Sequence, residues 1–383
     1  MRCVLLGFAL ILCCSVVLAD DGNPEHNGKT MSAWMTMARE NDAPRLRRIA
    51  VGSLSAIGQD ALPKIRREVC VALGKVFRSD SSGVVRAEAG KALGDISTEL
   101  LKDGELGDTS SVVIDLAEGL RVEKELEPKR TGTFAVGRYG AKAKNAVGSL
   151  TTLLSDKDAV VRENAANSLG RIGGESKTAT VELLKMLVAT EVPVRKAVVF
   201  ALGRIDPEDK AKVSLALAPF FATEKDQDVR MELVVSLGLL KEKNSDVAKA
   251  LAPLLKETHL ETRRVAAKTM AMFEGAAKGQ EKELVTAFKT DTDKLVRAYA
   301  LRALCATVSD AEKLVPILIT QLDSKTEKEA DVRIAVCDEL GLLGPDAQAA
   351  VPVIRDTQKD PEPRVRDAAA AALKKLIAKK KEQ

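Results

Sequence analysis

Histidine and cysteine do much of the metal binding and nucleophilic chemistry in proteins, and this chain offers little of either. It has two histidines, His26 and His259, and neither is followed by an acidic residue. The sequence shows no Cys-x-x-Cys, haem-attachment or zinc spacing, and no glycine-rich phosphate loop, nucleophile elbow or calcium loop. We therefore expect no catalytic residues, no cofactor and no metal ligands.

The charged residues that do recur at fixed spacing are mostly arginines, and a row of them could bind an anionic partner. The basic slot is filled by Lys129, Arg162, Arg195, Arg230, Arg263, Arg297, Arg333 and Arg366. An acid often stands four residues earlier: Asp158, Glu191, Asp226, Asp293, Glu329 and Glu362. Such acids can cap a helix and pair with an arginine of the same or the next unit, so we interpret the row as structural.

The elements that must hold these arginines are helices. After Arg162, apolar residues follow at plus 3, 7 and 10 (Ala165, Leu169 and Ile172), which is one face of an α-helix. Asp158 can cap its start, and Gly173 can end it in a left-handed conformation. The other copies follow nearly the same pattern, although Thr307 breaks the last slot after Arg297.

The copies are regularly spaced and alternate with a second apolar segment. From Lys129 onward the basic slots are 33, 33, 35, 33, 34, 36 and 33 residues apart. The second segments lie at 181–188, 247–255 and 314–322, for example. Each unit is therefore two antiparallel helices, A then B, that bury their apolar faces against neighbouring units. The predicted fold is an all-α solenoid of about ten repeats over residues 30–378.

The first part of the array is less regular. Arg47, Arg66 and Arg86 carry the same pattern at intervals too short for whole repeats, so 61–77 is interpreted as the B helix of the first repeat. Before Lys129 an extra polar, glycine-containing loop at 101–109 is either a functional loop or a tolerated insertion.

Six glycines follow the plus 7 leucine directly, where each costs about 1 kcal/mol relative to alanine. They are Gly74, Gly94, Gly170, Gly203, Gly238 and Gly341. We attribute this slot to the close approach of a neighbouring helix.

The termini are expected to lie outside the repeats. Residues 1–19 have a positive start, an apolar core and small residues before Asp20, which is typical of a cleavable secretory signal peptide; the alternative is an uncleaved anchor. Residues 20–29 are predicted to be a flexible lead-in, 30–39 a capping helix with Trp34 in the core, and 379–383 a basic tail. The predicted localisation is periplasmic or secreted, with no membrane span after cleavage.

Charge and cysteines restrict the partners further. Removing residues 1–19 takes away Arg2 and no acid, so the formal net charge falls from +4 to +3, which gives no case for nucleic acid. Of the three remaining cysteines, Cys70 and Cys337 occupy a small buried slot. A Cys305–Cys337 disulfide is conceivable between adjacent repeats, but the two differ by about a helical turn in height.

The pattern Asp-x-x-Val-Arg-x-x-Ala-Ala-x-x-Leu-Gly-x-Ile-Gly at 158–173 resembles the HEAT repeat, in the variety seen in phycobilisome-lyase-like proteins, here as an exported bacterial-type member. Related enzymes include a hydroxylase that binds two irons through His-Glu pairs, which this chain lacks. Phycobilin lyases attach a tetrapyrrole, but aromatic residues make up only 3% of the chain and form no cluster. His259, four residues before Arg263, is interpreted as a turn or cap residue.

These observations predict a non-enzymatic scaffold, expected to be a monomer, that binds a partner protein along the B-helix surface. On that surface basic residues alternate with acids: Lys210, Lys212, Lys243, Lys249 and Lys282. The alternative is a HEAT-type enzyme or ligand carrier, lyase-like or hydroxylase-like. The sequence leaves the partner and the binding residues unknown.

Overall fold

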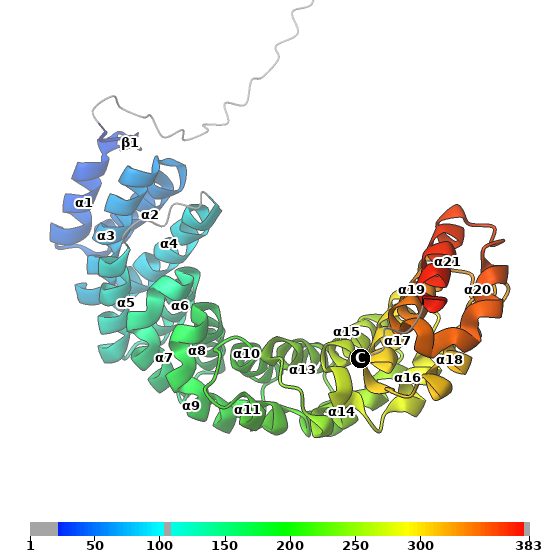
Figure 1. Cartoon of the computed structure of the whole chain (residues 1–383). Helices are drawn as coiled ribbons and strands as arrows, with labels where there is room; N and C mark the ends of the chain where they lie inside the picture. Colours follow the sequence, from blue (N-terminus) through cyan, green and yellow to red (C-terminus); the bar gives the residue numbers. More distant parts are fainter. Residues whose placement is uncertain (1–21, 103–108, 379–383) are drawn as a thin grey trace, which may run out of the picture. The chain divides into compact units, whose positions relative to one another are not determined.

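The computed structural model of the chain describes residues 22–102 and 109–378. The expected signal peptide, the tail at 379–383 and residues 103–108 of the expected loop lie outside these ranges. The chain divides into two compact units, Met1–Ala201 and Leu202–Gln383. Within each unit the helices form two rows, which we call the A row and the B row (Figure 1).

The A row consists of single α-helices. In the first unit they are α2 (Pro44–Asp60), α4 (Gly83–Lys102), α6 (Leu126–Arg138), α8 (Ala159–Ile172) and α10 (Val192–Leu202), which ends at the boundary. In the second unit they are α13 (Gln227–Leu240), α15 (Leu260–Met272), α17 (Lys294–Thr307), α19 (Ala330–Leu343) and α21 (Pro363–Leu376). The prediction of an all-α solenoid is confirmed.

The B row is more broken, and many of its helices contain 3-10 segments. In the first unit it consists of α3 (Pro63–Ser79), α5 (Ser110–Val122), η1 (Gly140–Ala146) with α7 (Val147–Leu153), and η2 (Gly173–Ala179) with α9 (Thr180–Lys185) and η3 (Met186–Val188). In the second unit it consists of α11 (Lys210–Leu217) with α12 (Phe220–Thr223), α14 (Ser245–Leu251) with η4 (Ala252–Lys256), η5 (Glu274–Ala277) with α16 (Glu281–Thr290), α18 (Ala311–Ile319), and η6 (Gly344–Ala350) with α20 (Val351–Thr357).

Local sequence accounts for where the A helices begin and end. The Asp158 carboxylate accepts a hydrogen bond from the Val161 amide at 3.1 Å, and Gly173 ends α8 with a φ of 76°. Asp226 and Asp293 cap α13 and α17 in the same way. The capping predictions hold for these aspartates, whereas Glu329 and Glu362 make no side-chain cap.

For the irregular start of the array, the structure confirms one prediction and corrects another. Helix α3 lies between α2 and α4 and stacks on α5, so it belongs to the B row despite its A-like pattern. Helix α4 continues to Lys102, so 101–102, expected in the loop, prolong a helix instead.

The lead-in differs from the expectation of a flexible segment. Strands β1 (Glu25–His26) and β2 (Lys29–Thr30) pair antiparallel around Asn27 and Gly28, both of which have positive φ. Asn-Gly favours this tight hairpin turn, because both residues tolerate that backbone conformation. The hairpin leads into α1 (Met31–Glu40), which is capped by Thr30.

Close approach explains the tightest of the recurring glycines. A Cβ on Gly170 would lie 2.9 Å from the Ala201 Cα, and one on Gly203 would lie 2.7 Å from the Ser236 Cα. Gly74 has ordinary van der Waals room, with its nearest neighbours at 3.4 Å. The close approach of a neighbouring helix therefore explains Gly170 and Gly203 well and explains Gly74 less well. In the described ranges no helix is long and apolar enough to cross a membrane.

Candidate functional site

The basic slot is held inside the stack by backbone contacts. The Nη1 of Arg333 donates to the carbonyl oxygens of Glu327 at 2.8 Å and Lys328 at 3.1 Å, six and five residues earlier. The same pair of bonds is made by Arg47, Arg162, Arg195, Arg263 and Arg366. Each arginine thereby ties the turn before its own A helix to that helix.

The other guanidinium nitrogens reach forward to the next repeat. Nε and Nη2 of Arg333 each lie 2.8 Å from a different carboxylate oxygen of Asp360, and both side chains are about 3% exposed. Four more arginines in or aligned with the basic slot pair with this two-pronged geometry: Arg47–Asp80, Arg86–Glu123, Arg263–Asp291 and Arg297–Glu327. Bidentate pairs of this kind are strong and directional.

The acid that completes each of these pairs stands six residues before the next basic slot. Two of the acids four residues before a slot pair through both carboxylate oxygens with other arginines, Asp158 with Arg130 and Asp293 with Arg264. Asp360 precedes Arg366 by six, and Glu327 precedes Arg333 by six. Where the sixth position is Ala189, Glu191 accepts from Arg162 at 2.8 Å instead. The prediction that the acids four residues before the slot pair with an arginine of a neighbouring repeat is confirmed for Asp158, Glu191 and Asp293, whereas the acids six residues before the slot were not foreseen.

These contacts lower the pKa of acidic partners such as Asp360 and Glu123. Burial opposes ionisation of Asp360, but the hydrogen bonds from Arg333 and the Glu362 backbone amide, together with the charges of Arg333 and Arg366, outweigh it and keep the pKa of that carboxyl below its ordinary value. The pKa of Glu123 is lowered for the same reasons, with Arg86 as its partner. The arginine row is therefore a structural ladder, and the interpretation of it as structural is supported.

The remaining sequence candidates lie apart from one another. His259 caps α15, and its Nδ1 accepts from the Thr262 amide at 3.4 Å, as predicted. His26 lies in the hairpin, where its carbonyl accepts from Trp34 Nε1 at 2.8 Å. Trp34 is 4% exposed, which supports its assignment to the core. In the described part of the chain, no group of three or more His, Cys, Asp or Glu residues could hold a metal.

The three cysteines of the described residues are free, so Cys305 and Cys337 are not joined in this structure. Cys70 and Cys337 are buried, as expected, and burial raises the pKa of each thiol to about 12. Burial raises the pKa of Cys305 as well, and this thiol is hydrogen-bonded to Glu339. The cysteines therefore lack the lowered pKa that marks reactive thiols.

The lysines proposed for the B-helix surface are all in the second unit. Lys212, Lys243, Lys249 and Lys282 are exposed, and Lys210 is half-buried. Lys210 pairs with Asp206 at 2.7 Å, and Lys243 pairs with Glu274 at 2.6 Å. Lys249 lies beside a smaller hollow of about 570 Å³ between α11–α12 and α14–η4.

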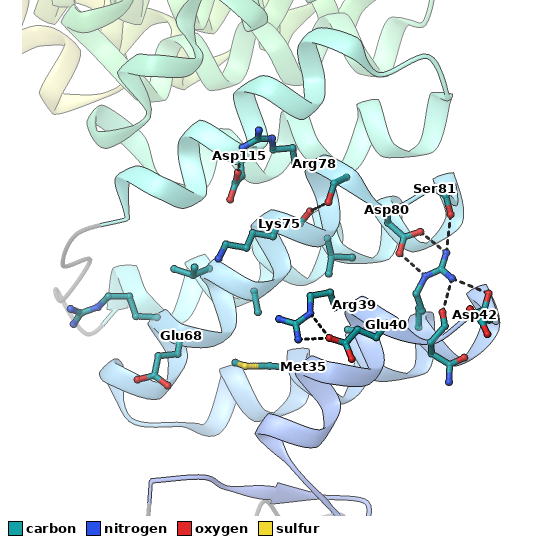
Figure 2. Close-up of a pocket in the computed structure, with 18 of the residues that line it drawn as sticks. Met35, Arg39, Glu40, Asp42, Glu68, Lys75, Arg78, Asp80, Ser81 and Asp115 are labelled. Atoms are coloured by element: carbon teal, nitrogen blue, oxygen red, sulfur yellow. Dashed lines mark hydrogen bonds and ion pairs between the residues drawn. The ribbon is translucent and has the colours of Figure 1, made fainter.

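A wider groove lies in the first unit, between α1 and α3, and sequence reasoning did not foresee it. Its volume is about 1330 Å³. Figure 2 shows Met35 and Arg39 on the α1 side and Glu68, Lys75 and Arg78 on the α3 side. The groove exists because α1 packs mainly on α2 and leaves one face of α3 open.

The far end of the groove is closed by ion pairs. Arg78 lies 3.0 Å from both the Asp115 and the Glu118 carboxylates of α5. At the neighbouring turn Asp80 accepts from Arg47 at 2.7 and 2.9 Å. These pairs fix the walls of the groove at this end. The side chains nearer its middle are open to contact with a partner.

Comparison with known proteins identifies the repeats. A family model described as HEAT repeats matches residues 115–203 and 281–374. An engineered protein of known crystal structure is 19% identical, with a TM-score of 0.63 over 91% of this chain and 99% of its own. A second engineered protein is 22% identical, with a TM-score of 0.39 over 61% of this chain and 96% of its own. No curated protein matches the chain.

At such identities a structural likeness concerns the fold alone, and the first engineered protein shares that fold along most of the chain. The repeat match falls on both units and includes the stretch at 158–173 whose pattern resembles the HEAT repeat. The chain is an α-solenoid in which residues 115–203 and 281–374 match HEAT repeats.

Proposed function

We propose that this chain is a non-enzymatic scaffold that binds a partner protein after export to the periplasm or the cell exterior. The observation that carries the proposal is the groove between α1 and α3, which combines an open helix face with exposed charge. HEAT solenoids offer extended surfaces suited to protein partners. The phycobilisome-lyase-like variety of repeat remains a sequence resemblance only.

The test of binding uses the mature protein, beginning near Asp20, as bait in an envelope extract of the source cells. We expect one or a few proteins to be retained at stoichiometric amounts and to rebind when purified. A bait that retains nothing specific would contradict the scaffold. An absorption spectrum and metal analysis of the same bait would detect a pigment or iron, either of which would favour the ligand-carrier or enzyme alternative.

The test of export is N-terminal sequencing of the protein from its native cells. The motif at 17–19 predicts a mature start at Asp20, so a retained Met1 would contradict cleavage.

A further inference from the structure

One face of α3 is open because, in the described part of the chain, no preceding B helix packs against it. Helix α5 packs against α3 on one side and against η1 and α7 on the other, so it is covered from both directions of the stack. On its other side α3 meets α1 only weakly, since α1 packs on α2. A groove of about 1330 Å³ remains where a preceding B helix would lie in a longer stack.

The size of this groove suits a short helix. An α-helix about 10 Å across rises about 1.5 Å per residue, so 1330 Å³ corresponds to roughly eleven residues, or three turns. Lys64 and Lys75 lie eleven positions apart on α3, which spans about 16 Å of helix. The basic residues along the groove therefore cover the same length as the helix that would fit.

The chemistry of the groove is an apolar strip beside unpaired positive charge. Val71 and Ala72 are half-buried in the middle of α3, and Met35 is half-buried opposite them on α1. In the described structure no carboxylate lies within ion-pair distance of Lys64 or Lys75.

Arg67, between those two lysines, adds a further unmet donor. It lines the groove, and its buried Nε has no hydrogen-bond partner among the described residues. The charge of this guanidinium beside the groove favours an incoming carboxylate over an apolar side chain. Among the described residues, Glu68 and Asp42 are the acids of the groove that make no ion pair, against the three cations Lys64, Arg67 and Lys75, so positive charge prevails by one.

We propose that the groove between α1 and α3 binds an amphipathic α-helix of a partner protein, with its apolar face on Val71 and Ala72 and acidic residues against Lys64, Arg67 and Lys75. This inference rests on the scaffold function proposed above and names the class of partner. Helix-in-groove recognition of this kind uses apolar anchors at i, i+3, i+4 and i+7.

The direct test uses the full mature chain and a fluorescein-labelled model helix of about 14 residues, with leucines at those four positions and glutamates on both flanks. Fluorescence anisotropy should show saturable binding that weakens as salt is raised, because exposed ion pairs are screened. A second helix with lysines in place of the glutamates should bind at least tenfold more weakly. Equal binding of the two helices, or none of the acidic one, would overturn the proposal.

Variants locate the binding. Lys64→Glu combined with Lys75→Glu should weaken the acidic helix at least tenfold. Lys91→Glu combined with Lys124→Glu makes the same charge change at exposed positions outside the groove and should leave binding unchanged. Ala72→Trp should also abolish binding by filling the groove, with helicity checked by circular dichroism. Equal losses in the groove pair and the control pair would contradict the site.

The same variants separate this inference from the scaffold proposal. If the wild type and the Lys64→Glu, Lys75→Glu chain retain the same partner equally well, the groove proposal fails and the scaffold stands. If the wild type retains no partner, the scaffold fails. Concentration-dependent dimerisation that the groove variant abolishes would identify a second copy of the chain as the occupant and overturn the partner-helix proposal.

Discussion

At the scale of single residues, the arginine ladder joins each repeat to the next by charge as well as by apolar packing. A buried ion pair is of little net value when replaced whole by apolar residues, but breaking it from one side leaves an unpaired buried charge. Arg333 and Asp360 are the clearest case, because both are nearly inaccessible and their hydrogen bonds are bidentate.

We expect Arg333→Ala to lower the free energy of unfolding by about 3–5 kcal/mol, since it strands the Asp360 carboxylate and removes the donor to the Glu327 carbonyl. Urea unfolding followed by circular dichroism measures this. Arg39→Ala is the control, because Arg39 is 72% exposed in its pair with Glu40 and should change little. Similar losses in the two variants would argue against the ladder as a source of stability.

Alanine should have opposite effects on stability at the recurring Gly203 and at Gly52, a glycine outside the recurring set. Gly203→Ala would place a Cβ against the Ser236 backbone and should destabilise the fold by about 1–3 kcal/mol. Gly52→Ala lies in an exposed part of α2 with nothing within 4 Å, so it should stabilise by up to about 1 kcal/mol. Thermal unfolding of the two variants compares them, and stabilisation by Gly203→Ala would refute the close-approach explanation.

The sequence predicted this residue-scale picture only in part. The basic slot, its structural role and the pairing of the acids four residues before it followed from the repeat alignment, whereas the acids six residues before the slot were not recognised as partners. Asp360 lies 27 residues beyond Arg333, and only the stacking of two repeats brings them together. Aligning the sixth position before each basic slot would have exposed the recurring acids there, because Asp156, Asp291 and Glu327 all occupy it.

At the scale of elements, the hairpin and α1 close the N-terminal end of the described stack. The cap was predictable from Trp34 and the apolar residues around it. The hairpin was missed although Asn27-Gly28 is a strong turn signal, because the polar composition around it was given more weight. The groove could not be predicted, since it depends on how far α1 shifts sideways when it packs on α2, and no sequence period encodes that shift.

The hairpin predicts a local effect on Trp34. Gly28 has a φ of 73°, so Gly28→Val forces a β-branched residue into a left-handed conformation at about 1–2 kcal/mol. We expect the hairpin to loosen, the Trp34 Nε1 bond to the His26 carbonyl to break, and the tryptophan emission to shift to the red while total helicity stays unchanged. Asn27→Gly keeps the turn and should leave the emission unchanged, so a red shift in that variant as well would exclude this explanation.

At the scale of the whole molecule, each of the two units has its own set of inter-repeat ion pairs. Because these pairs need ionised acids, together they make the stability of the fold depend on pH. Among the described carboxyl groups with a resolved shift, the pKa is lowered for Glu123, Asp156, Asp158, Glu191, Asp293, Asp310, Asp331 and Asp360. Of the same carboxyl groups, only Glu163 and Glu339 have a pKa that burial raises. The lowered set includes acids of both units, so acid should weaken both.

We therefore expect stability to be constant near neutral pH and to fall as the pH drops below about 4, the ordinary pKa of these carboxyls. An acid whose pKa is lowered in the folded state binds protons more readily when unfolded, so its contribution is present above the unfolded pKa and is lost as the pH falls through the folded pKa. Thermal unfolding between pH 7 and pH 2.5 measures the slope. Asp360→Asn should make that slope shallower, because it removes one of the shifted acids, and a stability that rises below pH 4 would show that the raised pKa values of Glu163 and Glu339 dominate instead.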